Sequence, residues 1–258
     1  MDRSKMIELY TRDQRIEVEY PDTRKETTPT VVRQIPTSGN REGAIIYSQL
    51  SEENADEIIR RQIAYFEGMG QNFEWKLYDF DQPLDLKDRL AAHGFIIEEA
   101  EAIMVLDLAE APAMLLQPTR HDVRRIENPD KLADVLTVES KVWEEDYTWL
   151  IQYLGEALSK HPDQMSVYVA YVDGQPASAA WAYFPHHSRF ASLWGGSTIS
   201  DYRKQGLYTA LLAVRLQEAA ARQVGYLTVD ASPMSQPILE KFGFERIAYS
   251  YPCKWKVG

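Results

Sequence analysis

One short pattern occurs twice in the chain, and it constrains the fold more than any other feature. The segments LAAHGF, residues 90–95, and LEKFGF, residues 239–244, each close an apolar helical pattern with Gly-Phe. A glycine directly after such a pattern is a common helix stop, because it adopts a left-handed backbone without strain. In both places a segment with strand character follows. The pattern predicts an internal duplication, although two unrelated strand–helix–strand segments would also produce it.

The second half of the chain shows clear, alternating strand and helix signals. The turn Asp173-Gly174 is typical of a hairpin between two strands rich in apolar residues. We expect strands at 120–127, 165–172, 176–184, 189–199 and 225–231 with a last strand pair in 246–257, and helices at 129–143, 147–160, 206–223 and 235–244. This order predicts an α+β fold with an antiparallel start and one parallel crossover.

The first half repeats this plan in a degraded form. We expect strands at 43–50 and 73–80, two more within 96–108, and helices at 51–69, with Ser51 as N-cap, and at 85–95. The sequence therefore predicts two halves, residues 1–115 and 116–258. Each half is expected to be a mixed, mostly antiparallel sheet flanked by helices.

Composition limits the partners and the compartment. The net charge is −11, and nearly all of the excess acid lies in residues 1–115, which argues against a nucleic-acid partner. Solubility alone would also explain the acidic surface. A single cysteine excludes an internal disulfide and a cysteine metal cluster, and no apolar run is long enough to span a bilayer. We expect a cytoplasmic protein without metal, nucleic-acid or membrane partners, and leave a homodimer open.

A basic turn before a long apolar helix is the candidate binding site. Arg203 and Lys204 precede Gly206, where the helical pattern begins. A helix start presents unpaired N–H groups and partial positive charge, and glycine lets a ligand approach them. The turn is thus either an anion cradle for a phosphate or pyrophosphate or a solvated helix start. The matching entrance in the first half, SEENADE (51–57), is acidic and would repel an anion.

This segment resembles the acyl-CoA-binding segment of the GNAT superfamily of N-acetyltransferases. Arg203 and Gly206 match the family signature [R/Q]-x-x-G-x-[G/A], while Tyr208 replaces its final small residue. The order of elements over 120–258 and the ending ILEKFGF also resemble the family. Because the first half repeats the plan of the second in a degraded form, it is similar to a degenerate GNAT copy. The resemblance implies acetyl-CoA as cofactor and transfer of its acetyl group to a primary amine of a small molecule.

The resemblance also assigns parts of the coenzyme to segments of this chain. The Gly195-Gly196 pair suits a bulge that splays its strand from YLTVDA (226–231), so that the pantetheine arm can enter. Ser232 or Ser235 stands near the position of a coenzyme-touching asparagine of the family. The implied contacts are the backbone of Gly196, Ser197 and Thr198 for the pantetheine arm, and Arg203, Lys204 and the N–H groups of Gln205, Gly206, Leu207, Tyr208 and Thr209 for the pyrophosphate.

Two catalytic groups that are common in the family are missing here. The positions of the usual tyrosine acid and glutamate base hold Leu239 and Ser192. We nominate Asp230 as a substitute base and Tyr208 as a proton donor, against the plainer interpretations of a strand-end carboxylate and a packing tyrosine. Residues 144–146, Glu-Glu-Asp, would attract a cationic amine or form a solvated loop.

The missing groups leave a second function open. Positioning alone can lower a barrier by about 7–11 kcal/mol, so their absence does not exclude transfer. The alternative is a catalytically inactive acyl-CoA-binding sensor or interaction module. Among the remaining candidates, we expect His186 and His187 in a strand turn and the tryptophans at 143, 149, 181 and 194 in the core.

Overall fold

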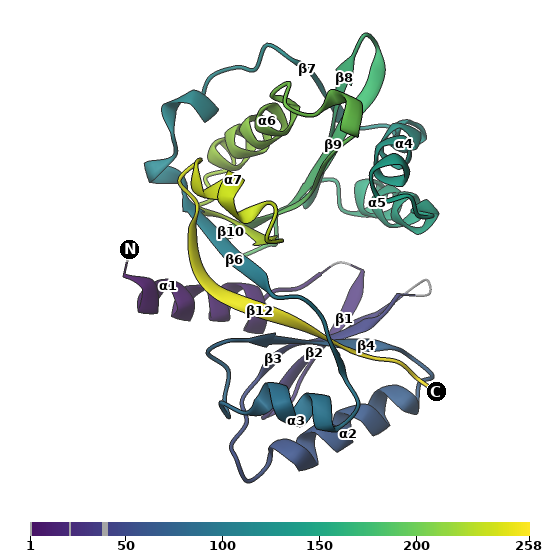
Figure 1. Ribbon diagram of the computed structural model, residues 1–258, viewed down its shortest axis with the longest axis vertical. Coiled ribbons are helices and arrows are strands. Elements are labelled where there is room, and N and C mark those ends of the chain that lie inside the picture. The colour runs from purple at the N-terminus through teal and green to yellow at the C-terminus, as the bar shows by residue number, and fades with distance from the viewer. Residues whose placement is uncertain (1, 21, 38–40) are drawn as a thin grey trace. The chain divides into compact units, whose positions relative to one another are not determined.

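The chain divides into two compact units in the computed structural model, which describes residues 2–20, 22–37 and 41–258 (Figure 1). Unit 1 consists of the chain up to Met104 together with Asp230–Glu240 and Glu245–Gly258, and unit 2 of Val105–Val229 with Lys241–Phe244. Both units take segments from both halves of the sequence. The expected division into domains 1–115 and 116–258 therefore stays a prediction.

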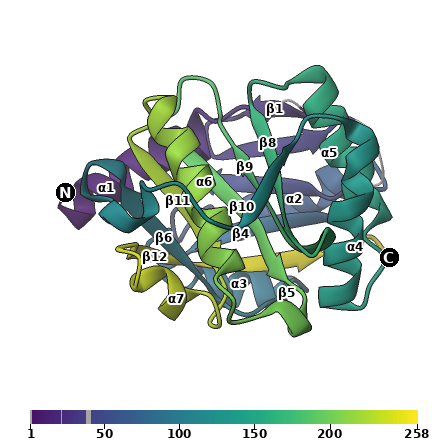
Figure 2. The same cartoon turned by 90° about the horizontal axis from the view of Figure 1, so that it is seen from above.

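Unit 2 is built on a mixed sheet with the strand order β11-β10-β9-β8-β7. Its antiparallel strands are β7 (Asp122–Ile126), β8 (Met165–Val172), β9 (Gln175–Tyr183) and β10 (Phe190–Thr198); β11 (Tyr226–Ala231), whose last two residues belong to unit 1, is parallel to β10. Helices α4 (Leu132–Trp143) and α5 (Thr148–Lys160) cover one face and α6 (Leu207–Ala221) covers the other (Figures 1 and 2).

The central strands of unit 2 are buried because helices cover both of their faces. Strands β8 and β9 are apolar almost throughout, which is the pattern of a strand with no solvent-facing side. Small side chains such as Ala177 and Ala180 let α6 approach, and Leu207 and Leu211 pack into this layer. Leu207 is thereby anchored at the start of α6, so the position of that helix end is determined by the core.

Unit 1 is also a mixed sheet, with the order β1-β2-β3-β4-β12 and a short strand β5 beside β12. The strands are β1 (Thr23–Thr27), β2 (Val31–Pro36), β3 (Gly43–Ser48), β4 (Phe73–Tyr78), β5 (Ile96–Ile97) and β12 (Glu245–Trp255), and β6 (Glu101–Asp107) runs from unit 1 into unit 2. The helices are α1 (Arg3–Tyr10), the π-helix η1 (Thr11–Ile16), α2 (Ala55–Glu67), α3 (Leu86–Ala92) and α7 (Gln236–Glu240).

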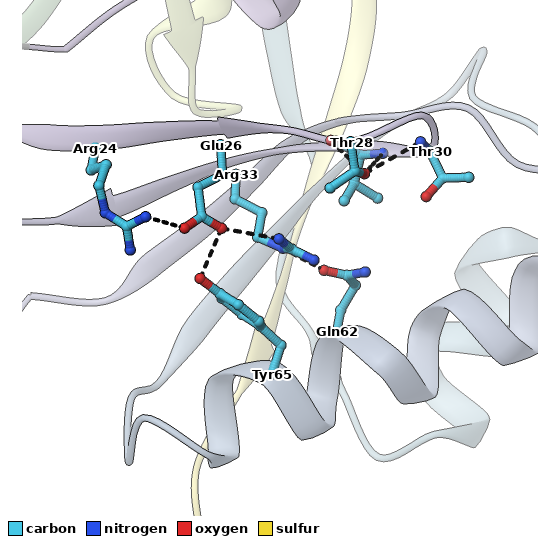
Figure 3. A network of polar contacts seen from close by, with 8 residues as sticks. Arg24, Glu26, Thr28, Thr30, Arg33, Gln62 and Tyr65 are labelled. Carbon is cyan, nitrogen blue, oxygen red and sulfur yellow. Dashed lines mark hydrogen bonds and ion pairs between the residues drawn. The ribbon is translucent and has the colours of Figure 1, made fainter.

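Polar and aromatic contacts hold the outer strands of unit 1 against α2 (Figure 3). The Glu26 carboxylate accepts hydrogen bonds from Arg33 at 3.0 Å and the Tyr65 hydroxyl at 2.8 Å, and it also pairs with Arg24. Arg33 in turn donates to Gln62 on α2 at 2.7 Å. Beneath this network Phe66 and Phe73 stack, with ring centroids 4.1 Å apart. The Glu26 carboxylate therefore has a donor on each oxygen.

The expected fold class is confirmed: the fold is α+β, and each half of the chain contributes one parallel strand–helix–strand crossover, β3–α2–β4 and β10–α6–β11. The repeated Gly-Phe endings also share their backbone conformation, since φ is +94° at Gly94 and +85° at Gly243. A Cβ at Gly94 would lie 3.1 Å from the Trp255 ring, so packing as well as φ requires glycine there. These shared features support the internal duplication.

Two local expectations were wrong. Helix α2 begins at Ala55 with Asn54 as N-cap, and Ser51 instead donates its backbone N–H to the Asn54 side chain at 2.9 Å. Residues 246–257 do not form a strand pair, because β12 is one strand of 11 residues that pairs with β4 from Ser250 to Trp255. The segment has no glycine that would turn the chain, so a single long strand satisfies its backbone groups.

Candidate functional site

Strands β10 and β11 part after a short ladder. Their parallel pairing joins Phe190 to Tyr226, Ala191 to Leu227 and Ser192 to Thr228. Strand β10 then continues to Thr198 with β9 as its partner, and the register of that pair skips Gly196. The expected bulge and splay are therefore present. Beyond Ser192, the edge of β10 that faces away from β9 can accept an extended ligand as an additional strand.

The bulge requires both glycines. Residues Gly195 and Gly196 have φ of +68° and +87°, where other residues are strained. A Cβ at Gly195 would lie 2.5 Å from the Trp181 ring, and one at Gly196 would lie 3.0 Å from the Tyr208 ring. Aromatic rings therefore pack directly onto the bulge, and Ser178 adds a hydroxyl bond of 2.6 Å to the Ser197 carbonyl.

A buried arginine braces the same bulge from α6. The Arg215 guanidinium donates to the carbonyls of Trp181 at 3.3 Å and Trp194 at 3.2 Å, and its Nε donates to Leu211 at 3.0 Å. Burial lowers the pKa of Arg215 to about 10. Burial also raises the pKa of the nearby Tyr208 hydroxyl, so this side chain stays protonated at neutral pH.

The entrance of α6 is an exposed turn capped by glycine. Gly206 is the N-cap residue with φ +85°, and the residues from Arg203 to Gly206 are all exposed. The first turn of α6 contains no acidic residue. Ala210 donates to the Gly206 carbonyl at 2.9 Å, so the N–H groups of residues 207–209 precede the first helical hydrogen bond. These groups and the helix dipole favour an anion.

The basic side chains at this entrance are held by local contacts. Arg203 donates through Nε to the Thr198 carbonyl at 3.0 Å, and no partner for its Nη groups occurs among the described residues. Gln205 donates to the Asp201 carbonyl at 3.3 Å. His121, which the sequence did not single out, also borders the entrance, since a Cβ at Gly206 would lie 3.1 Å from its Nε2.

Asp230, Ser232 and Ser235 lie in unit 1, whereas residues 144–146 lie in unit 2. The Asp230 carboxylate is ion-paired with Lys76, and both side chains are largely buried. Burial lowers the pKa of Lys76, but the surrounding acidic groups, Asp230 first among them, more than offset this and the pKa is raised well above its usual value. The hydroxyls of Ser232 and Ser235 lie 3.2 Å apart before α7. The assignments of Asp230 as base and of the two serines to the coenzyme stay predictions.

A buried glutamate on α4 was missed by the sequence reasoning. Glu139 is 2% exposed, and its Oε2 accepts hydrogen bonds from the Ser197 hydroxyl and from Trp143 Nε1, each at 3.0 Å. Its Oε1 is buried without a hydrogen-bond partner among the described residues. Burial raises the pKa of this carboxyl group. The only signal in the sequence is an acidic residue within an apolar helical pattern.

Three of the four tryptophans expected in the core are exposed. Trp143, Trp149 and Trp194 are 53%, 54% and 45% exposed, and only Trp181 is buried. Trp143 ends α4 and Trp149 begins the next helix, so these rings lie at helix ends that the core does not enclose. The expectation for His186 is confirmed: it lies in a strand turn, where it contacts Asp163 at 2.7 Å.

The part of the chain that holds this geometry matches a known protein family. Residues 121–244 match the model of the acetyltransferase (GNAT) family. This part of the chain is a GNAT acetyltransferase domain. The match includes the splayed strands and the entrance of α6, and GNAT enzymes generally transfer acyl groups from acetyl-CoA. No curated protein matches the chain.

The chain shares its fold with solved proteins that include GNAT members. A GCN5-related N-acetyltransferase from Kribbella flavida superposes with a TM-score of 0.69 at 12% identity, covering 98% of this chain and 93% of that protein. A conserved protein of unknown function from Staphylococcus epidermidis gives 0.70 at 13%, with coverages of 97% and 99%. A tandem GNAT protein from the clavulanic acid biosynthesis pathway gives 0.58 at 14%, with coverages of 94% and 86%.

No helix within residues 2–20, 22–37 and 41–258 combines the length and the apolar character needed to cross a membrane. No group of three or more His, Cys, Asp or Glu side chains within these ranges is arranged to hold a metal ion.

Proposed function

We propose that the chain transfers the acetyl group of acetyl-CoA to a primary amine of a small molecule. The observation that carries this proposal is the pairing of a splayed, glycine-bulged strand with a glycine-capped, cationic helix entrance in one unit. A coenzyme with a diphosphate and an extended amide-bearing arm matches both features.

The residues present fit this coenzyme. The N–H groups of residues 207–209 would hold the diphosphate, and Arg203 and Lys204 would add positive charge at its rim. The edge of β10 from Leu193 to Thr198 would pair with the pantetheine arm. When bound, acetyl-CoA supplies an activated acyl thioester. The protein would supply position, exclusion of water and handling of the amine proton.

The decisive test substitutes the helix cap. Gly206→Asp places a carboxylate at the anion cradle and a side chain against His121. We expect acetyl-CoA affinity, measured by calorimetry, to fall by at least about 100-fold, because like charges meet at a helix start. The matched control is Gly174→Asp, which adds the same charge at a left-handed glycine with open space around it. Unchanged affinity in folded Gly206→Asp protein would refute the cradle.

A second candidate function is an acyl-CoA sensor without turnover. The residues at the family's usual catalytic positions favour it, since Leu239 is buried and apolar and Ser192 accepts a hydrogen bond from Trp194 at 3.0 Å. Release of free thiol from acetyl-CoA should be measured with a panel of amines. Coenzyme binding without release for any amine would favour the sensor.

A further inference from the structure

Among the described residues, the donors to the Glu139 carboxylate all bind one of its two oxygens. Its helix, α4, packs on β9 and β10, and both hydrogen bonds that it accepts go to Oε2. The donors are Ser197 from β10 and Trp143, four residues later on α4, and these two are also 3.2 Å apart. The hydrogen bonds from Ser197 and Trp143 therefore fix the orientation of the carboxylate, while Oε1 has no donor among the described residues.

An enclosed carboxylate oxygen without a donor needs a physical explanation. Buried polar atoms are almost always hydrogen-bonded, and an ionised carboxylate can only accept. Leaving Oε1 unpaired opposes folding, so a structural role alone does not account for Glu139. A bound donor would satisfy the atom, and a cationic donor would also compensate the buried charge.

The place of this carboxylate points to the acceptor. Ser197 directly follows the bulged Gly196, on the stretch of β10 that β11 leaves unpaired. Glu139 is therefore one side chain away from the strand edge assigned to the pantetheine arm. It lies on the α4 face of the sheet, whereas Tyr208 of α6 packs against Gly196. The carboxylate therefore lies on the face of the sheet opposite α6, one side chain from the bulge.

The surroundings of Glu139 favour a cation. Burial raises the pKa of Tyr147, and the charges of Glu145 and then Glu139 raise it further, which places negative charge around this hydroxyl. The Trp143 ring is half-exposed beside the carboxylate, and aromatic rings attract alkylammonium groups. Together the acidic and aromatic groups match a primary ammonium on a short carbon chain.

We propose that Glu139 binds the ammonium group of the acceptor through Oε1 and takes one of its protons. This inference rests on the transferase function proposed above and identifies its base. Ser197 and Trp143 are positioning residues, because they act through Glu139. Asp230, which is ion-paired with Lys76, is not needed for this step.

The reaction balances with this one base. The ammonium gives one proton to the Glu139 carboxylate, and the nitrogen lone pair forms the new C–N bond at the acyl carbon. The C–S bond breaks with its electron pair going to sulfur, and the second nitrogen proton ends on that thiolate. Glu139 then releases its proton to water. The products are the acetylated amine, free thiol and one proton.

The test is Glu139→Gln, which keeps shape and hydrogen bonding but removes the base. We expect kcat with an active amine to fall by about 100- to 10,000-fold, the usual contribution of a general base. The wild-type rate should rise with pH through a group whose pKa lies above that of ordinary glutamate, and the variant should lose this limb. The acetyl-CoA dissociation constant should stay within about twofold, which separates this result from failure of the coenzyme site.

A matched control uses another carboxylate of unit 2. Glu218 on α6 accepts from Ser166 at 2.7 Å and from Tyr168 at 2.8 Å, and it also pairs with Arg222. It thus resembles Glu139 in its hydroxyl donors but has partners on both oxygens. We expect Glu218→Gln to keep the pH profile and the amine KM, even where its thermal stability drops.

A binding measurement without coenzyme tests the same assignment independently of turnover. The probe is n-butylamine, with n-butanol as the uncharged match, and the signal is the fluorescence of Trp143 beside Glu139. We expect a saturable change with the amine alone, lost in Glu139→Gln. Trp143→Phe removes the reporting ring and serves as the control that the signal comes from this tryptophan. An unchanged pH profile and an unchanged amine response in Glu139→Gln would overturn the proposal. If wild-type protein does not bind acetyl-CoA, the transferase function fails, while this measurement still decides whether Glu139 binds an ammonium group.

Discussion

The crossovers β3–α2–β4 in unit 1 and β10–α6–β11 in unit 2 share a backbone design. In each, three residue pairs join the parallel strands, ending at Ile45 with Trp75 and at Ser192 with Thr228. In each, the first strand also carries a bulge against its antiparallel neighbour, at Ile46 in β3 and at Gly196 in β10. Both halves therefore form a strand edge that could receive an extended ligand.

Within the described part of the chain, unit 1 closes this edge with one of its own side chains and unit 2 does not. Arg15 of η1 donates through Nε to the carbonyl of the bulged Ile46 at 2.9 Å. Its Nη groups pair with the Asp81 carboxylate at 2.8 and 2.7 Å, and its guanidinium lies 3.9 Å from the centroid of the Tyr78 ring. One buried arginine thus takes the place that a ligand would need.

The entrances of the two crossover helices also differ, in their charge. Helix α2 begins with acidic residues, and the Asp56 carboxylate is bound by His93 at 2.9 Å and by Arg89. Helix α6 begins at exposed Gly206 with a basic turn before it. A shared backbone can therefore become a structural element or a ligand site, depending on a few side chains. We expect one coenzyme per chain, in unit 2.

The largest effect is expected from removing the closing arginine. Arg15→Ala leaves Asp81 buried without its partner, so the free energy of unfolding should fall by about 3–5 kcal/mol. Chemical denaturation measures this loss. The control Arg61→Ala removes the partner of Glu57 in a pair whose side chains are both exposed, and it should cost less than about 1 kcal/mol. Equal losses would contradict the role given to Arg15. Calorimetry should still give one coenzyme per chain, because the acidic α2 entrance remains.

A smaller loss is expected at the open bulge of unit 2. Gly195→Ala puts a Cβ within 2.5 Å of the Trp181 ring at a left-handed φ. Strain and overpacking together should lower the free energy of unfolding by about 2–3 kcal/mol. Gly174→Ala has a similar φ but open space, so its loss should be about 1 kcal/mol. If thermal denaturation shows no difference between the two variants, the packing of Trp181 on the bulge is not what requires glycine.

The smallest expected effect is the change in stability when a hydrogen-bonded glutamate is replaced by glutamine, and its sign should differ between Glu26 of unit 1 and Glu139 of unit 2. In unit 1, burial raises the pKa of Glu26, but hydrogen bonds from Tyr65, Arg33 and Arg24 outweigh it and the pKa is lowered. Glu26→Gln should therefore cost about 1 kcal/mol at neutral pH. Because the folded pKa lies below the unfolded one, this difference should disappear as pH falls through the lowered value.

Glu139→Gln should change stability in the opposite sense. Burial raises the pKa of Glu139, so the folded protein binds more protons than the unfolded chain between the ordinary glutamate pKa and the raised one. Wild-type stability therefore falls as pH rises through that window. The variant should be more stable by about 1 kcal/mol above it, and equal to wild type in acid. Urea titrations at several pH values check both glutamates, and the same sign for both would refute the contrast.

Local sequence patterns were sufficient for most elements of the second half. The strand expected at 165–172 has those bounds, and the helix expected at 206–223 spans Leu207–Ala221. The splay at Gly195-Gly196 and the glycine cap at Gly206 also follow from residues next to one another in sequence. Periodicity, turn chemistry and left-handed glycines act over a few residues, so the sequence alone could specify the strand–turn–helix segment of the candidate coenzyme site.

Tertiary structure decided the contacts between distant segments. Glu139 is a candidate base only because α4 packs where Ser197 emerges from the bulge, 58 positions later in the chain. Arg15 closes unit 1 because Asp81, 66 positions away, lies beside it. Strand β12 belongs to unit 1 because β4 offers it a pairing edge. Such contacts depend on packing and strand register, and no local pattern of residue types contains that information.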